Sequence, residues 1–104
     1  MSETVTFVTC KDRKQATAIA RALVKEKLAA CVNVLPGIAS IYRWKGRVEE
    51  AREVLLLIKS RRALSKKLVS RVRALHTYEV PEVVTIPIAA GNPAYLRWVR
   101  QSTR

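Results

Sequence analysis

The order of strand-like and helix-like segments limits the folds open to this chain of 104 residues. Residues 5–10 are rich in β-branched and aromatic side chains, which favours a first strand. A helix should begin near Arg13, because Asp12 and Gln15 have the spacing of a capping box. Its apolar residues recur at helical spacing, and the pattern fades around Lys27.

The middle of the chain predicts a long hairpin. Residues 29–42 read as a strand that Pro36 and Gly37 interrupt, which indicates a bend or bulge. Residues 44–47 contain a glycine and favour a turn. Residues 53–59 form a continuous apolar run, which is typical of a strand covered on both faces.

The last third predicts two further helices and a strand. Ser60 is placed to cap a second helix, whose apolar stripe runs from Leu64 to Leu75. Residues 83–88 resemble a strand that contains a proline, so we expect it to lie at an edge of the sheet or to end irregularly. Asn92 and Pro93 form an N-cap followed by proline, which begins a short final helix.

This order predicts an α/β (α+β) fold of ferredoxin-like type, a βαββαβ sandwich with a C-terminal helix, in one domain over residues 1–104. Two helices would cover one face of a four-stranded sheet. The other face would stay partly bare, which indicates oligomerisation.

The charge is strongly basic, with 20 Lys and Arg against 8 Asp and Glu and a net charge of +12. Basic residues on the outward helix faces fit either a solvated surface or unspecific polyanion binding. No nucleic-acid-binding motif accompanies them, so we expect no specific nucleic acid partner.

No apolar run approaches the ~20 residues of a membrane span and no signal peptide is visible, so we expect a cytoplasmic protein without a membrane partner. Cys10 and Cys31 are expected to be free thiols.

Several motifs together resemble the CutA family of divalent-cation-tolerance proteins. The resemblance extends from about Val5 to Thr103 and is carried by AACVN at 29–33, PG at 36–37, SIYRWKG at 40–46, HTYEVPE at 76–82 and YLRW at 95–98. It implies a ferredoxin-like homotrimer that takes part in tolerance of copper and other divalent metals. It also implies an architecture similar to that of the PII signalling proteins.

The same resemblance implies a metal pair. Copper binding in some family members is attributed to a cysteine that ends the first strand and to two histidines before the Tyr-x-x-Pro-Glu motif. Here these positions are Cys10 and His76, with Leu75 in place of the first histidine. Other readings stay open: His76 at a helix C-terminus could interact with the helix dipole, and Cys10, whose pKa the neighbouring Lys11 and Arg13 could lower, could be either a ligand or an inert thiol.

Two further groups of residues are candidates. Aromatic side chains near the hairpin turn and on the last helix are expected in the trimer interface, namely Tyr42, Trp44 and Trp98. Charged and aromatic side chains could line a cleft for a cation or a polar ligand, or form salt bridges, namely Lys59, Tyr78, Glu79 and Glu82.

We therefore expect a non-enzymatic trimer that binds metal ions or a small ligand weakly. It requires no cofactor and has copper or another divalent cation as a possible ligand. Alternatives are a PII-like module that binds an anionic effector near Lys59 and the loop after Asn33, a hydrolase of acylphosphatase type, and a polyanion-binding protein. The loop 11–13 has no glycine for a phosphate cradle, which disfavours the hydrolase.

Overall fold

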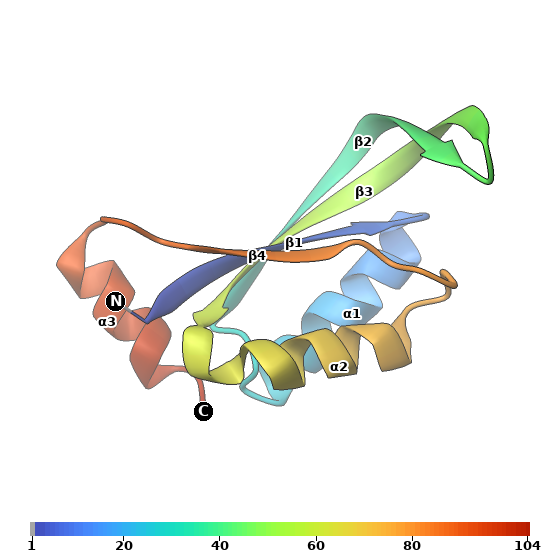
Figure 1. The fold of residues 1–104 in the computed structure, drawn as a ribbon. Coiled ribbons are helices and arrows are strands. Elements are labelled where there is room, and N and C mark those ends of the chain that lie inside the picture. The colour runs from blue at the N-terminus through green and yellow to red at the C-terminus, as the bar shows by residue number, and fades with distance from the viewer. Residues whose placement is uncertain (1) are drawn as a thin grey trace.

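The computed structural model describes residues 2–104 and contains a four-stranded antiparallel sheet with helices on one face (Figure 1). The strands lie in the order β2-β3-β1-β4. The elements are β1 (Glu3–Cys10), α1 (Arg13–Lys25), β2 (Cys31–Trp44), β3 (Arg47–Arg61), a 3-10 turn (Arg62–Leu64), α2 (Ser65–Leu75), β4 (Val83–Pro87) and α3 (Pro93–Gln101). The predicted fold class is confirmed.

The hairpin of β2 and β3 projects beyond the rest of the sheet (Figure 1). Its register runs from Cys31 opposite Lys59 to Trp44 opposite Arg47. The register shifts between Leu35 and Ile38, which confirms the predicted bend. At the tip, Lys45 and Gly46 both have positive φ, of 49° and 78°. A two-residue turn with positive φ at both positions has a backbone twist that matches the right-handed twist of the strands it connects.

The core lies between the sheet and the two helices α1 and α2. It is built from fully buried aliphatic side chains, among them Val8, Ile19, Leu23, Leu56, Ile58, Leu68 and Val72. Burial of one such side chain contributes roughly 1.5–3 kcal/mol to the free energy of unfolding. The residues of α1 and α2 that are buried against the sheet are those that recur at helical spacing in the sequence, so this spacing identified the packed face of each helix correctly.

The prediction that Ser60 caps the second helix is wrong. Strand β3 continues to Arg61 because this residue pairs with Glu3 of β1. Ser60 is fully buried in the strand, and its hydroxyl donates to the carbonyl of Leu28 at 2.6 Å. Helix α2 begins only at Ser65, after the 3-10 turn, and has no side-chain cap.

The caps of the other two helices agree with the prediction. Asp12 accepts a hydrogen bond from the backbone of Gln15 at 2.9 Å, and Asn92 accepts one from the backbone of Ala94 at 3.1 Å. These bonds satisfy backbone N–H groups that have no partner within the first turn. Within residues 2–104, no helix is long and apolar enough to cross a membrane.

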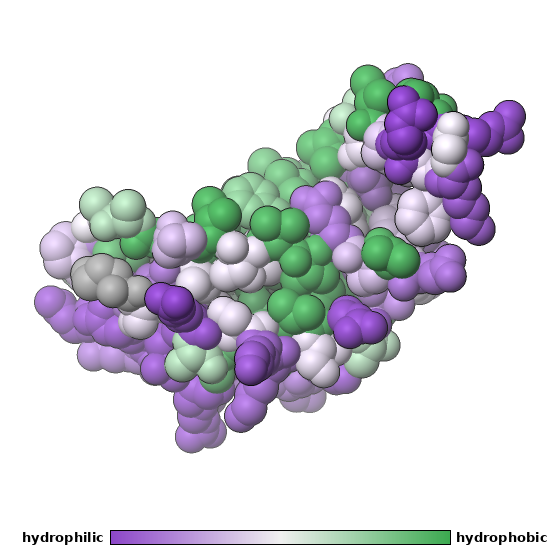
Figure 2. Space-filling view, viewed as in Figure 1, coloured by the Kyte–Doolittle hydropathy of each residue, from purple (hydrophilic) through white to green (hydrophobic). Residues whose placement is uncertain are grey.

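The face of the sheet opposite α1 and α2 stays uncovered, as predicted. Apolar side chains are exposed on it, including Leu35, Val84 and Ile86. Further exposed apolar residues lie near the hairpin tip, where Ile41 is 71% exposed and Val48 is 66% exposed. Figure 2 shows hydrophobic residues over the region of β4 and along the hairpin. Patches of this kind mark interaction surfaces in soluble proteins.

Candidate binding pocket at the base of the hairpin

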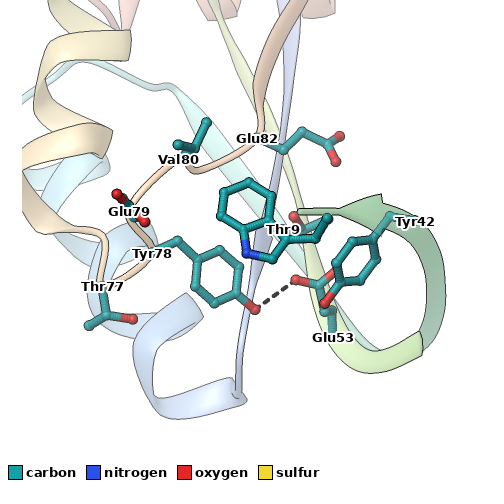
Figure 3. Close-up of a pocket in the computed structure, with 9 residues that line it drawn as sticks. Thr9, Tyr42, Glu53, Thr77, Tyr78, Glu79, Val80 and Glu82 are labelled. Atoms are coloured by element: carbon teal, nitrogen blue, oxygen red, sulfur yellow. Dashed lines mark hydrogen bonds between the residues drawn. The ribbon is translucent and has the colours of Figure 1, made fainter. Parts of the chain in front are cut away.

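An open pocket of about 500 Å³ lies between the hairpin and the segment that joins α2 to β4 (Figure 3). Three elements contribute to it: the end of β1, the β2–β3 hairpin and residues 77–82. The lining residues are Thr9, Tyr42, Trp44, Glu53, Thr77, Tyr78, Glu79, Val80 and Glu82. The volume falls in the range of roughly 300–1,000 Å³ that small-molecule sites occupy.

His76 fixes the start of the joining segment. It follows α2 directly and is buried. Its Nδ1 accepts a hydrogen bond from the backbone N–H of Tyr78 at 3.1 Å, so the proton of the neutral ring is on Nε2. Nε2 then donates to the carbonyl of Thr9 at 2.7 Å. His76 therefore connects the end of α2 to the end of β1 and sets the direction of Tyr78.

Tyr78 lies across the pocket from the hairpin. Its ring centroid is 4.6 Å from that of His76, and its hydroxyl donates to Oε2 of Glu53 at 2.7 Å. Burial, followed by the hydrogen bond to Glu53, raises the pKa of Tyr78 far above its ordinary range. The hydroxyl therefore keeps its proton at neutral pH and remains a donor to the carboxylate.

The pocket gathers negative charge in a basic chain. Glu53, Glu79 and Glu82 are three of its eight acidic residues. Figure 3 shows the side chains of Tyr42, Tyr78 and Glu53 pointing toward one another, with Glu79 and Glu82 on opposite sides. A concave surface lined by charges of one sign concentrates ions of the opposite sign. The arrangement is suited to a cation.

The structure brings together candidates that the sequence placed in two separate groups. Tyr78, Glu79 and Glu82 from the predicted cleft share the pocket with Tyr42 and Trp44, which were expected in a subunit interface. All five come from either the hairpin or the joining segment. The contact of Tyr42 and Trp44 with another subunit stays a prediction.

Lys59 and Trp98 lie elsewhere. The ammonium group of Lys59 donates to the side chain of Asn33, and Lys59 is six residues along β3 from Glu53, or ~20 Å. Trp98 is on α3, where its ring centroid is 5.5 Å from that of Tyr95. Neither side chain lines the pocket, so Lys59 does not share a cleft with the carboxylates.

Sequence reasoning missed Glu53 and Thr9. Glu53 appeared only as the first residue of an apolar strand, yet its side chain is 8% exposed and faces Tyr78. The sequence feature that could have identified Glu53 is its position as a carboxylate at the start of an apolar strand, in a chain with only eight acidic residues. Such a residue needs a partner, because burial of an unpaired charge is costly.

The surroundings of Cys10 contradict one expectation about its acidity. The side chain is fully buried on β1, and burial, followed by the nearby Glu53 carboxylate, raises the pKa of the thiol to about 11. The proposed lowering by Lys11 and Arg13 is wrong because both of those side chains are exposed. Cys10 and Cys31 are both free, and their strands β1 and β2 are not neighbours in the sheet.

The pair of Cys10 and His76 does not fit a metal centre as it stands. A metal ion would need a thiolate from Cys10 and a free nitrogen from His76. The thiol is protonated at neutral pH, and both ring nitrogens already have hydrogen-bond partners. Across residues 2–104, no three His, Cys, Asp or Glu side chains are placed to hold one ion. A metal at this pair stays a prediction.

Comparison with known proteins extends over almost the whole chain. The family model of the CutA1 divalent ion tolerance protein matches residues 4–102. The chain is 52% identical to Protein CutA of Mus musculus over 98% of its own length and 58% of the mouse protein. It is also 52% identical to the divalent-cation tolerance protein CutA of Thermus thermophilus, covering 97% of this chain and 98% of that one.

Solved structures agree with the sequence comparison. The Cut A1 structure from Thermus thermophilus superposes with a TM-score of 0.96 at 52% identity and covers 98% of this chain and 99% of that chain. The CutA structure from Archaeoglobus fulgidus superposes with a TM-score of 0.93 at 33% identity, covering 96% and 97%. Both chains have the fold described above along nearly their full length. This chain therefore belongs to the family of CutA1 divalent ion tolerance proteins.

Proposed function

We propose that this protein supports tolerance of divalent cations as a homotrimer that binds cations weakly in the pocket at the base of the hairpin. The observation that carries the proposal is the placement of Glu53, Glu79 and Glu82 around one pocket in a chain with a net charge of +12. Carboxylate oxygens suit hard divalent cations. Because no three ligands converge on one point within residues 2–104, the bound ion keeps most of its water.

The homotrimer is supported by the uncovered face of the sheet. Its exposed apolar residues, such as Val84 and Ile86, need a partner of similar character, and a further copy of the chain offers the same surface. The projecting hairpin carries Ile41 and Val48 at its exposed end, so it can reach a neighbouring subunit. Burial of these side chains supplies the free energy of assembly.

A binding role agrees better with the pocket than catalysis does. A nucleophile and a general base within hydrogen-bond distance of each other are the usual mark of covalent or acid–base chemistry. The hydroxyl nearest to a carboxylate is that of Tyr78, whose raised pKa makes it a poor nucleophile. The protein is therefore proposed to act through binding and assembly.

We expect a cytoplasmic location, in line with the sequence analysis. Relatives have been named for other compartments: one from Arabidopsis thaliana is described as chloroplastic and one from Archaeoglobus fulgidus as periplasmic. Fractionation of cells that produce the full-length protein from its own gene tests this expectation. Recovery in a membrane or secreted fraction would contradict it.

The test of the proposed function combines mass with metal titration. Light scattering of the purified, reduced protein should give three times the mass of the 11.7 kDa chain. Calorimetric titration with Mg²⁺, Zn²⁺ and Cu²⁺ should show weak binding that Glu79→Gln with Glu82→Gln removes. Glu49→Gln with Glu50→Gln is the matched control, because these exposed carboxylates on β3 lie outside the pocket.

The two proposed ligand sets give different results in this titration. Cys10→Ser should leave the binding of Mg²⁺ and Zn²⁺ unchanged if the carboxylates hold the ion, whereas His76→Ala is used for Cu²⁺ alone, because His76 also positions the segment that carries Glu79 and Glu82. Loss of Cu²⁺ binding in either variant, with the fold intact, would instead establish the Cys10–His76 pair. A monomer that binds none of the three metals would refute the proposed function.

A further inference from the structure

We propose that the pocket at the base of the hairpin binds a small organic cation with an alkylammonium group. The inference rests on the proposed function in that it uses the same cation-binding pocket, and it adds a second class of ligand, an organic cation, to the divalent metal ions. The pocket combines three aromatic rings with three carboxylates, namely Tyr42, Trp44 and Tyr78 with Glu53, Glu79 and Glu82. Aromatic faces and dispersed negative charge recognise an ammonium group with alkyl substituents.

The aromatic walls allow this pocket to hold an organic cation as well as a hydrated metal ion. In the single chain Tyr42 and Trp44 are 42% and 40% exposed, so their rings are accessible there to a ligand. The negative face of a ring attracts a cation and also contacts its methyl or methylene groups. A hydrated metal ion gains little from such walls. One ring already has a cation nearby, because Nζ of Lys45 lies 5.9 Å from the centroid of the Trp44 ring.

Glu53 gives the pocket a buried negative charge. Its side chain is 8% exposed, and its one hydrogen bond within residues 2–104 comes from Tyr78 to Oε2. No Lys or Arg forms an ion pair with Glu53 there; the two ion pairs of the described chain join Arg71 to Glu26 and Arg100 to Glu3. A buried carboxylate without a counter-ion is costly, and a cationic ligand would compensate it.

The spread of the carboxylates also favours an extended cation. Figure 3 shows Glu79 and Glu82 on opposite sides of the pocket, with Glu53 beside Tyr78 on the hairpin side. Three carboxylates so placed do not close around one ion, in agreement with the absence of any three-ligand metal cluster in residues 2–104. An alkylammonium ion needs no such convergence, because it is attracted by charge at longer range and by the rings.

Nuclear magnetic resonance of the assembled protein tests the inference through its two indole N–H signals, from Trp44 and Trp98. The probe is tetramethylammonium chloride, with sodium chloride at equal ionic strength and uncharged neopentyl alcohol as controls. The Trp44 signal should shift in a saturable way with tetramethylammonium alone. The Trp98 signal should stay in place, because Trp98 does not line the pocket. Trp44→Phe assigns the two signals.

Matched variants attribute the binding to the pocket. Glu53→Gln should weaken the binding of tetramethylammonium tenfold or more, whereas Glu50→Gln, which removes an exposed charge of the same hairpin, should change it less than twofold. Trp44→Leu should weaken it by about two- to thirty-fold, in line with a cation–π contact. Trp98→Leu should have no effect. Circular dichroism confirms that each variant is folded.

Butylammonium chloride, an analogue of a lysine side chain, separates a free ligand from a protein partner. Tighter binding of tetramethylammonium supports a free alkylammonium ion, and tighter binding of butylammonium overturns that assignment in favour of a lysine of another chain.

A Trp44 signal that responds equally to tetramethylammonium and to neopentyl alcohol overturns the inference. If the inference is overturned in this way but the protein still binds metal ions and has the mass of a trimer, the proposed function stands without the inference. If metal binding and the trimer mass are both absent while the Trp44 signal still shifts with tetramethylammonium alone, the inference stands without the proposed function.

Discussion

The hydroxyl of Tyr78 donates a hydrogen bond of 2.7 Å to Oε2 of Glu53, and this bond joins two segments that are 25 residues apart. Tyr78 belongs to the connection between α2 and β4, and Glu53 belongs to β3. The bond holds the base of the projecting hairpin against the body of the molecule. It also satisfies one oxygen of a buried carboxylate, so its loss affects stability as well as the shape of the pocket.

Tyr78→Phe should lower the free energy of unfolding by about 1–3 kcal/mol, because it leaves the Glu53 carboxylate buried without its donor. Urea denaturation followed by circular dichroism measures the change. Tyr42→Phe is the control, since the Tyr42 hydroxyl has no hydrogen bond within the described residues 2–104 and its side chain is 42% exposed. Equal losses in the two variants would contradict the assigned role of Tyr78.

Cys10 should resist alkylation in the folded protein. Its pKa of about 11 leaves ~0.1% thiolate at pH 8, on the order of 100-fold less than an ordinary thiol, and its burial slows the reaction further. Iodoacetamide labelling of a Cys31→Ser variant, followed by mass spectrometry, reports Cys10 alone. We expect slow labelling that becomes fast in urea. Fast labelling of the folded protein would show that the thiol is accessible and acidic.

The fold could be predicted from the sequence because its signals are local. The Asp12 cap, the apolar spacing of α1 and the bend at Pro36 and Gly37 each depend on residues within one turn or one strand, and the structure confirms them. The prediction for Ser60 was wrong because a contact between residues far apart in the sequence decides where β3 ends. Pairing of Arg61 with Glu3, at the far end of the sequence, extends β3 through the position that resembled a cap.

The site could be predicted only in part, for the same reason. Tyr78, Glu79 and Glu82 lie close together in the sequence and stand out as one motif, whereas Glu53 reaches them only through the register of β3. The expected acidity of Cys10 failed because proximity in the sequence says nothing about burial: Lys11 and Arg13 are exposed, and Cys10 is enclosed by the core. Metal binding, the trimer and the location remain predictions.

The ion pair between Glu3 and Arg100 should make stability depend on pH below the ordinary range of a carboxyl group. The hydrogen bond from Nη1 of Arg100 to Oε2 of Glu3, at 2.7 Å, is the main cause that lowers the pKa of Glu3 from 4.5. A lowered pKa in the folded state stabilises the protein above pH 4.5. That contribution is lost as the pH falls from 4.5 through the pKa of the folded state.

Arg100→Gln should therefore destabilise the protein at pH 7, and its difference from the unmodified protein should shrink as the pH falls below 4.5. Thermal denaturation over a series of pH values measures both curves. Arg97→Gln is the control, because Arg97 is exposed on the same helix and makes no ion pair within residues 2–104. A difference for Arg100→Gln that stays constant down to pH 2 would show that Glu3 does not carry the effect.

Lys27→Gly should stabilise the protein, although it removes a side chain. Lys27 follows the end of α1 with φ of 62°, in the left-handed region, where a Cβ atom costs about 1 kcal/mol. Glycine avoids that cost and loses more backbone entropy on folding, so the net gain is about 0.5 kcal/mol. The carbonyl of residue 27 still accepts the hydrogen bond from the backbone of Arg104, at 3.0 Å.

Lys25→Gly is the matched comparison, because it removes the same side chain two residues earlier, in the last turn of α1. There the backbone is helical, and glycine should cost about 0.5–1 kcal/mol. Urea denaturation of the two variants side by side should thus give changes of opposite sign. Destabilisation by both would show that the lysine side chain at position 27, and not its backbone conformation, decides the stability of the turn after α1.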